Sequence, residues 1–379
     1  MIPLFTHNDD ESFNRIEAVI KKSALVHNYK VIQKLCPNQK ILPMIKANAY
    51  GHGDIWTAKT LAPLPHLYGL GVATLNEAIT IRKQVSKKTN IIVFSGALPW
   101  SEEIGQACYR YQLTPVICTF NDWRKFSSSS WFKKINYKLK FNTGMNRLGI
   151  DVCMSSNIIQ KLEKNRKYLP SAVITHLAES ESPNSAISLK QKKTWKELTK
   201  QFKNKFPSLC FHFANSGAIW NSKSWGVDSS SQIIRPGISL YGIRPWQKAS
   251  RKNLIPVMTF RAKVIAKRKL IAGEKIGYGA SFKVKKPTHT AILSVGYEDG
   301  LHKALSNKGH VWLKNKPQPI LGAISMDMSC IQCTPQTKLN DWAELFGPHV
   351  DHWHQALLLK TTPYELLTSV SNRVKRKYV

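Results

Sequence analysis

A lysine stands where a predicted strand ends. The segment Lys40–Lys46 is apolar between its two lysines, and a loop that contains Gly51 and Gly53 follows it. Lysine is rarely placed at the end of a buried strand unless it is paired or functional. At the carboxyl end of a barrel strand it could form a Schiff base with an aldehyde cofactor. A solvated strand-end lysine is the simpler interpretation of Lys46 taken alone.

Further segments with chemically active residues follow in order along the chain. Together with Lys46–Gly53 they resemble the motifs of the alanine racemase family, and the resemblance spans about 330 residues, which makes the match specific. These segments are Lys140–Gly149, Thr175–Ala178, His212–Ser216, Ile234–Ile238, Ile276–Gly279, Val295–Gly300, Ser325–Asp327 and Pro363–Leu367.

The resemblance implies two catalytic bases. Lys46 would hold pyridoxal phosphate covalently and then act as one base, and Tyr278 would act on the opposite face. Racemisation needs this arrangement, because a proton leaves one face and returns to the other. Free tyrosine has a pKa of about 10, so the pKa of Tyr278 must be lowered, as a cationic neighbourhood could do, or its proton must be relayed. Gly277 and Gly279 would allow Tyr278 to lie on a tight loop.

The resemblance also assigns residues that contact the cofactor. Arg235 would face the pyridine nitrogen, and His176 would link Arg235 to Tyr278 by hydrogen bonds. A guanidinium donates hydrogen bonds without giving up its proton, so the ring would remain a weak electron sink. The expected phosphate ligands are Tyr50, Ser216, Gly237, Ile238 and Tyr364.

Substrate binding is implied for residues of both halves of the chain. Arg147 and the backbone of Met326 would bind the substrate carboxylate, and Asp327 would complete the site. Lys140 matches a lysine that is carbamylated in some family members, although a plain lysine or a bound anion could serve. Asn142 and Glu298 depart from the family's usual aspartate and alanine. Tyr297 and Tyr364 resemble a gate that limits substrate size.

The elements that must position these residues alternate along the first part of the chain. Nine short apolar runs predict strands, and stretches of helical pattern lie between them. This alternation predicts a parallel sheet, and with the resemblance it predicts a (β/α)8 TIM-like barrel over residues 1–245. The surplus strand, about residues 13–22, is implied to join the second domain. The predicted strands are Arg15–Lys22, Lys40–Lys46, Leu67–Ala73, Asn90–Ser95, Leu113–Cys118, Tyr137–Asn142, Ala172–Leu177, Phe211–Ala214 and Gln232–Tyr241.

After Pro245 the pattern changes to strand-like runs with short links rich in Gly, Pro and Lys. These predict a smaller β-rich C-terminal domain over residues 246–379. The resemblance implies a homodimer in which this domain supplies Tyr278 and Met326 to the partner's site. The runs are Val257–Ala266, Ala291–Val295, His310–Leu313, Ile320–Ile324 and Met328–Gln332, and helical patterns cover Trp353–Leu359 and Pro363–Val370.

The composition and the net charge of the chain limit the binding partners and the cellular location that can be expected for it. The net charge of +33 is spread along the chain, which fits a basic solvated surface or binding to nucleic acid or an anionic surface, although no nucleic-acid motif accompanies it. The seven cysteines fit a reducing cytoplasm, and the Cys330–Cys333 pair lacks the further ligands of a zinc site, so no metal is expected. No apolar run of about 18 residues predicts a membrane span, and Met1–Phe13 does not resemble a secretory signal.

Two enzymatic alternatives stay open beside an alanine racemase. A pyridoxal-phosphate decarboxylase would share the two-domain plan, but it would present an acidic partner to the ring nitrogen, which Arg235 argues against. A racemase of broader specificity, or one for serine, remains possible because a pocket discriminates one methylene by only about 1–3 kcal/mol. An alanine racemase would supply D-alanine for peptidoglycan precursors.

Overall fold

The structure is a computed structural model that describes residues 14–379. The contacts within the chain divide it into two units, which are described separately. The first unit is Ser23–Ile255, and the second is Pro256–Val379 together with the described residues up to Lys22. The second unit therefore begins at Pro256, later than the change of pattern at Pro245. Met1–Phe13, which bear on the absence of a secretory signal, lie outside the described residues.

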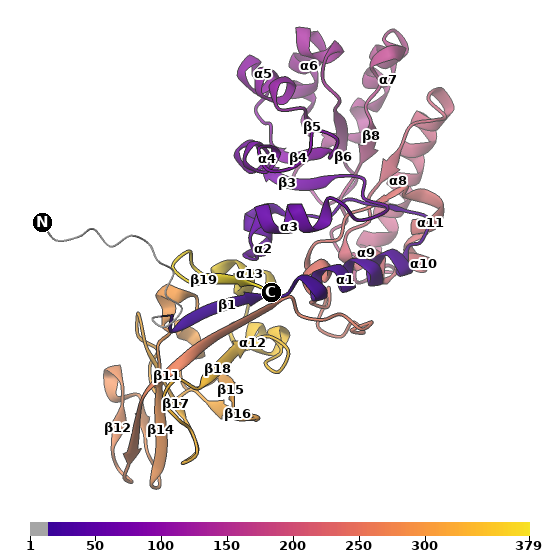
Figure 1. The fold of residues 1–379 in the computed structure, drawn as a ribbon. Coiled ribbons are helices and arrows are strands. Elements are labelled where there is room, and N and C mark those ends of the chain that lie inside the picture. Colours follow the sequence, from indigo (N-terminus) through magenta and orange to yellow (C-terminus); the bar gives the residue numbers. More distant parts are fainter. Residues whose placement is uncertain (1–13) are drawn as a thin grey trace, which may run out of the picture. The chain divides into compact units, whose positions relative to one another are not determined.

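The first unit is built on parallel strands that form a curled sheet (Figure 1). Its order is β3-β4-β5-β6-β8-β9, with the short β7 paired to β6, and β10 pairs in parallel with β2. The strands are β2 (Lys40–Ile41), β3 (Leu70–Thr74), β4 (Ile91–Gly96), β5 (Leu113–Ile117), β6 (Lys138–Asn142), β7 (Ile150–Asp151), β8 (Ala172–Ile174), β9 (Phe211–His212) and β10 (Ile233–Ile234).

Isolated parallel bridges connect these two sheets. Met44, which follows β2, bridges to Gly71 of β3, and Asn215, which follows β9, bridges to Arg235, which follows β10. The backbone N–H of Arg235 donates to the Ala214 carbonyl over 2.8 Å. Hydrogen bonds therefore run from β2 through β3 to β9 and on to β10, which pairs again with β2.

Helices lie between the strands of this unit. Helix α4 (Leu75–Arg82) begins with a capping box, in which Thr74 and Glu77 exchange side-chain and backbone hydrogen bonds. The other helices are α1 (Lys22–Leu35), α2 (Lys46–Tyr50), α3 (Asp54–Leu61), α5 (Glu102–Arg110), α6 (Phe120–Ser128), α7 (Ser155–Glu163), α8 (Ala186–Lys205), α9 (Ser216–Trp220), α10 (Ser222–Trp225) and α11 (Val227–Ser230). No helix of the described chain is long and apolar enough to cross a membrane.

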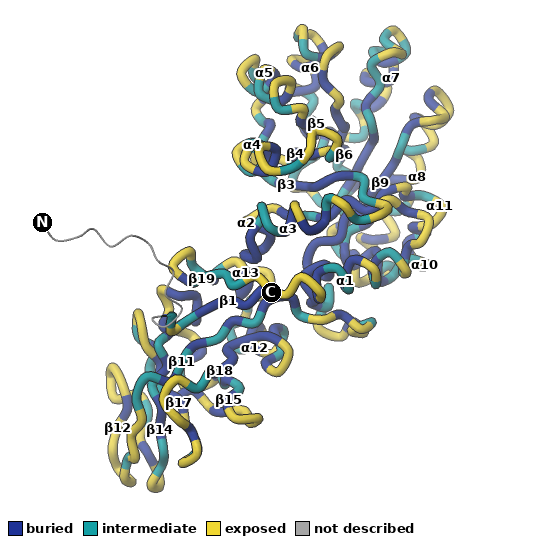
Figure 2. The backbone as a smooth tube through the Cα atoms, viewed as in Figure 1, coloured by how far each residue is buried: buried dark blue, intermediate teal, exposed yellow. Residues whose placement is uncertain are grey.

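The sheet buries an apolar cluster and also several polar side chains. A buried cluster joins side chains from β4, β5, β8 and β10, and Figure 2 shows the neighbouring strand β3 as mostly buried. Lys138 and Lys140 of β6 are also buried, although both are lysines. The members of the apolar cluster are Leu42, Ile92, Val116, Cys118, Ala172, Ile174 and Ile233.

The second unit is a mostly antiparallel sheet around the long strand β11 (Met258–Leu270). Strand β1 (Ile16–Ile20) lies here, between β11 and β19 (Lys375–Tyr378). The other strands are β12 (Lys275–Ile276), β13 (Phe282–Lys283), β14 (Thr288–Leu293), β15 (His310–Leu313), β16 (Lys316–Pro319), β17 (Ser329–Gln332) and β18 (Trp342–Phe346), and the helices are α12 (His352–Leu358) and α13 (Pro363–Ser369).

Some element predictions were wrong in detail. The predicted strand Ile320–Ile324 is reduced to one bridge between Ile320 and Ile331, because Gly322 adopts φ +75° and interrupts the extended backbone. The strands that were missed are β7 in the first unit and β12, β13, β16, β18 and β19 in the second. Cys330 packs against the buried cluster of Ile276, Val284 and Leu321.

Candidate active site

The expected site residues of the first unit follow the ends of its parallel strands. Lys46 comes after β2, Arg147 after β6, His176 after β8, Ser216 after β9 and Arg235 after β10. Carboxyl ends of neighbouring parallel strands meet at one edge, where α/β proteins bind ligands. The topology thus brings these five residues to the same edge.

The backbone after Lys46 forms a left-handed turn. Ala47, Asn48 and Ala49 adopt φ of 52°, 52° and 53°, and Tyr50 adopts 55°. Each non-glycine residue in this conformation costs roughly 1–2 kcal/mol. Such strain persists where the surroundings impose it, and it clusters at functional sites. The strained segment is therefore a candidate for holding Lys46 in a fixed position.

Lys46 and Lys140 lie in cationic surroundings. Desolvation and the Arg147 charge lower the pKa of Lys46, and the Glu77 carboxylate opposes this effect. Desolvation also lowers the pKa of Lys140, and the charges of Arg235, Arg147 and Lys46 act in the same direction. Both amines are therefore more easily deprotonated, and hence more nucleophilic, than a free lysine.

Arg235 is buried and its guanidinium is extensively hydrogen-bonded. Nη1 donates to the His212 carbonyl over 3.0 Å, and Nη2 donates to the carbonyls of Thr175 and Phe213 over 2.8 and 2.9 Å. Burial lowers the pKa of Arg235 to about 9, so it remains a cation at neutral pH. These contacts fix the plane of the guanidinium.

Two histidines accept hydrogen bonds from the same guanidinium. His212 Nδ1 lies 2.7 Å from Nη1, and His176 Nδ1 lies 3.4 Å from Nη2. Arginine can only donate, so both Nδ1 atoms are acceptors and each neutral ring carries its proton on Nε2. Burial, reinforced by the Arg235 charge, holds the pKa of both histidines well below the ordinary value. His176 was expected to link Arg235 to Tyr278, and the contact with Arg235 is one half of that link.

Tyr50, Ser216 and Gly237 lie together. The Gly237 N–H donates to Ser216 Oγ over 3.0 Å. A Cβ added at Gly237 would lie 2.6 Å from the Tyr50 hydroxyl oxygen, so only glycine allows this close approach. Ile238 follows in a buried 3-10 turn. Two hydroxyls and a backbone amide thus gather at one point.

The loop that carries Arg147 is organised by Asn142, the residue that departs from the family's usual aspartate. Asn142 Oδ1 accepts hydrogen bonds from the N–H groups of Gly144 and Asn146 over 3.1 and 3.0 Å. An amide oxygen supplies the same acceptor as a carboxylate here. Arg147 itself is exposed.

The expected site residues of the second unit form an exposed set. Tyr278 is 77% exposed and follows Gly277, whose φ is 71°. Tyr297, Met326 and Tyr364 are 41%, 50% and 38% exposed. Exposed aromatic and apolar side chains are typical of a binding surface where they form one contiguous patch.

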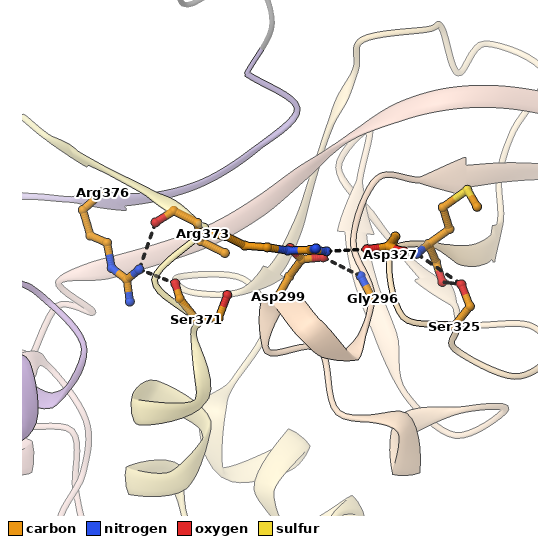
Figure 3. Close-up of polar contacts among 9 residues, drawn as sticks. Gly296, Asp299, Ser325, Asp327, Ser371, Arg373 and Arg376 are labelled. Carbon is orange, nitrogen blue, oxygen red and sulfur yellow. Dashed lines mark hydrogen bonds and ion pairs between the residues drawn. The ribbon is translucent and has the colours of Figure 1, made fainter. Parts of the chain in front are cut away.

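A charged network holds the segments that carry Met326 and Tyr297 (Figure 3). Arg373 Nε donates to Asp299 Oδ1 over 2.6 Å, and its Nη2 donates to Asp327 Oδ1 over 2.7 Å. The second oxygen of Asp299 accepts from the Gly296 N–H over 2.9 Å. Backbone bonds also run from the N–H groups of Tyr297 and Glu298 to the carbonyls of Ser325 and Met326.

Several residues of this geometry were missed from sequence. Glu77, Lys138, His212 and Arg373 contact or lie beside the expected site residues, but no role was predicted for them. The capping-box spacing of Thr74 and Glu77 was the one local signal available. The contacts of His212 and Arg373 depend on residues far away in sequence.

The fold and the site define a two-domain α/β enzyme: a lysine that follows strand β2, a buried arginine and two neutral histidines lie on a parallel α/β unit, and the chain has a further β-rich unit. The alanine racemase N-terminal domain model matches residues 20–245, and the C-terminal domain model matches residues 257–378. The chain belongs to the alanine racemase family and is an isomerase.

Individual relatives agree over nearly the whole chain. An alanine racemase of Methylacidiphilum infernorum is 34% identical over 367 residues, which cover 94% of this chain and 90% of that protein. One of Rickettsia akari is 33% identical over 371 residues, covering 95% and 98%. A solved alanine racemase from Bartonella henselae with covalently bound pyridoxal phosphate is 29% identical, with a TM-score of 0.85 and coverage of 96% of this chain and 99% of that chain.

Proposed function

We propose that this protein interconverts L-alanine and D-alanine with pyridoxal phosphate held by Lys46. The observation that carries the proposal is Arg235, a buried cation held by fixed carbonyls and neutral histidines at the strand ends. A decarboxylase of the same plan would place an acid there. Membership of the alanine racemase family supports the same substrate.

The residues of the first unit fit the cofactor. The hydroxyls of Tyr50 and Ser216, with the backbone of Gly237 and Ile238, would bind its phosphate, and Tyr364 would add a further hydroxyl. The close approach at Gly237 provides the cradle that a phosphate group needs. When bound, pyridoxal phosphate acidifies the Cα proton of an attached amino acid. Lys46 supplies the amine for its covalent attachment.

Two side chains would move the Cα proton. Lys46 Nζ would take or return it on one face, and the Tyr278 hydroxyl would do so on the other. Arg235 would donate to the ring nitrogen without giving up its proton, which limits electron withdrawal and favours return of the proton to Cα over side reactions. His176, with its Nε2–H free of Arg235, would pass a hydrogen bond on toward Tyr278.

Other residues would bind and select the substrate. Arg147 and the backbone N–H of Met326 would bind the alanine carboxylate, and Asp327 would hold the Met326 segment through Arg373. Tyr297 and Tyr364 would form a gate that limits side-chain size. Carbamylation of Lys140 would place an anion among Arg147, Arg235 and Lys46, which is where their mutual repulsion favours one.

The first unit is proposed to be a complete (β/α)8 barrel. The ring of pairings from β2 through β9 to β10 and back to β2 supports this, because eight parallel strands take part in it besides β7. Its domain would cover about residues 23–255, and β1 would belong to the β-rich domain.

The protein is also proposed to act as a cytoplasmic homodimer. The exposed Tyr278, Tyr297 and Met326 would enter the barrel mouth of the partner subunit. All seven cysteines are unpaired, which suits a reducing compartment. The product D-alanine would supply peptidoglycan precursors.

The test mixes two inactive variants. Lys46→Ala lacks the attachment amine, and Tyr278→Ala lacks the opposite base. After subunit exchange each heterodimer would contain one complete site, so activity should return to up to about half the wild-type value per heterodimer. Alanine racemisation is measured by circular dichroism, and exchange by native mass spectrometry.

A matched control mixes Lys46→Ala with Lys46→Arg, which leaves every site without the lysine and should stay inactive. If exchange occurs and the first mixture also stays inactive, the shared-site proposal fails. If wild-type protein shows no visible absorption that borohydride abolishes, the cofactor assignment to Lys46 fails.

A further inference from the structure

The left-handed turn that follows Lys46 is held from outside by Glu77 of α4. Glu77 Oε1 accepts a hydrogen bond of 2.7 Å from the Ala47 N–H, the first amide after Lys46. Its Oε2 accepts from the N–H groups of Ala73 and Thr74 over 2.8 and 3.0 Å. One carboxylate thus ties the peptide next to Lys46 to the junction of β3 and α4.

The turn has its own internal hydrogen bonds, but none of them uses this amide. The Gly51 N–H donates to the Ala47 carbonyl, and the Gly53 N–H donates to the Asn48 carbonyl, each over 3.0 Å. The Asp54 N–H donates to Asn48 Oδ1 over 3.0 Å. A further bond, from the Ala49 N–H to the Ile45 carbonyl over 3.0 Å, spans Lys46. Glu77 adds the side-chain contact at the amide that directly follows Lys46.

We propose that Glu77 is a positioning residue for Lys46: it anchors the Ala47 amide and sets the direction and charge of the lysine amine. This inference rests on the proposed role of Lys46 in binding the cofactor. Glu77 contacts the backbone beside Lys46, so it acts through that residue and is not itself a base in the proposed reaction.

Charged groups from several elements act on the Lys46 amine. Arg147, after β6, lowers its pKa, and Glu77 raises it. Lys140 of β6 and His176, after β8, interact electrostatically with the same amine. Asp54 of α3 interacts with Glu77. Removing the Glu77 charge leaves desolvation and the cations unopposed, so the pKa of Lys46 must fall further.

The experiment measures the Lys46 amine without using the cofactor. The full chain, freed of pyridoxal phosphate, is treated with formaldehyde and cyanoborohydride at a series of pH values, and methylation of the Lys46 peptide is quantified by mass spectrometry. Glu77→Gln should move the midpoint of methylation to lower pH by on the order of one pH unit. Glu77→Asp, which keeps the charge, should move it less.

Two control variants distinguish positioning of Lys46 by Glu77 from general effects of net charge and of helix capping. Glu163→Gln removes a carboxylate that pairs with Lys205, so it matches the change in net charge. Thr74→Ala removes the cap of α4 but keeps the Glu77 carboxylate. Both should leave the Lys46 midpoint unchanged. In the loaded enzyme Glu77→Gln should lower kcat roughly tenfold with little change in the KM for alanine.

An unshifted Lys46 midpoint in Glu77→Gln, or an equal shift in Thr74→Ala, would overturn the proposal. Hydrogen exchange of the wild-type protein gives a second test that needs no variant. The Ala47 amide must be protected, and rapid exchange there would also overturn the proposal. Failure of the wild-type protein to bind pyridoxal phosphate at Lys46 would instead count against the proposed function, because the methylation midpoint does not depend on the cofactor.

Discussion

Lys138 offers a test of how the interior of the first unit tolerates charge. Its side chain is fully buried, and its amine donates a 2.8 Å hydrogen bond to the Tyr68 hydroxyl. Desolvation lowers its pKa from 10.5 to about 8, and the Arg235 charge acts in the same direction. A buried amine without a carboxylate partner destabilises the fold, so Lys138→Met should raise the free energy of unfolding at neutral pH.

The magnitude follows from the pKa. A fall from 10.5 to about 8 corresponds to about 3 kcal/mol, at 1.36 kcal/mol for each pH unit. The variant loses the hydrogen bond to Tyr68 and the contact of the amine with its ring, 4.6 Å from the centroid. These are worth roughly 1–2 kcal/mol together. The expected net gain is therefore about 1–2 kcal/mol.

The gain must depend on pH with a definite sign. Between pH 8 and 10.5 the unfolded chain binds more protons at this position than the folded chain, so wild-type stability rises with pH. Below about pH 8 the full penalty is present, and above 10.5 it is gone. The advantage of Lys138→Met should therefore be largest near pH 7 and should shrink as the pH rises toward 10.

The assay is urea unfolding followed by circular dichroism at pH 7 and at higher pH, with midpoints compared between variants. Lys87→Met, at an exposed position, serves as the control and should change stability by less than about 0.5 kcal/mol at either pH. A Lys138→Met protein that is less stable than wild type at pH 7, or a gain that does not vary with pH, would refute the reasoning.

Three further changes test the candidate site. Gly237→Ala places a Cβ 2.6 Å from the Tyr50 hydroxyl and should weaken pyridoxal phosphate binding at least about tenfold in an absorbance titration; wild-type affinity would contradict the phosphate assignment. Arg235→Glu should slow racemisation and increase pyruvate from transamination, and an unchanged ratio would mean that Arg235 does not face the ring. Arg373→Leu leaves the buried Asp299 carboxylate with the Gly296 N–H but without its ion-pair partner, which should cost about 1–3 kcal/mol of stability and raise the KM for alanine; a lower Tm with the KM unchanged would limit Arg373 to a structural role.

The alternation of strands and helices could be predicted from the sequence because each strand is short, apolar and bounded by turns. All nine runs predicted in the first part of the chain overlap a strand of the structure, including β1, which lies in the second unit. The strands of the β-rich unit were predicted less completely. The missed strands β18 and β19 contain charged residues, and their place in the sheet depends on pairing with β11, β15 and β1, which local pattern does not encode.

The interior of the first unit shows why pattern alone misses buried charge. In the segment Lys138–Asn142 lysines alternate with Leu139 and Phe141, which is typical of a strand with one solvent-exposed face. Both faces are buried in the structure, because the strand lies in a parallel sheet with helices outside it. Sequence therefore suggested a role for Lys140 through the family resemblance but gave no reason to examine Lys138.

Charge also explains why the candidate site is difficult to recognise before it is assembled. Lys46, Lys140, Arg147 and Arg235 are far apart in sequence, and each alone is an ordinary basic residue in a chain with a net charge of +33. Only the fold makes their charges act on one another. Repulsion of this kind is relieved by an anion, and a phosphate and a carboxylate are the two anions that the proposed reaction brings. In the proposed function, the same basic residues would therefore favour binding of the cofactor and of alanine.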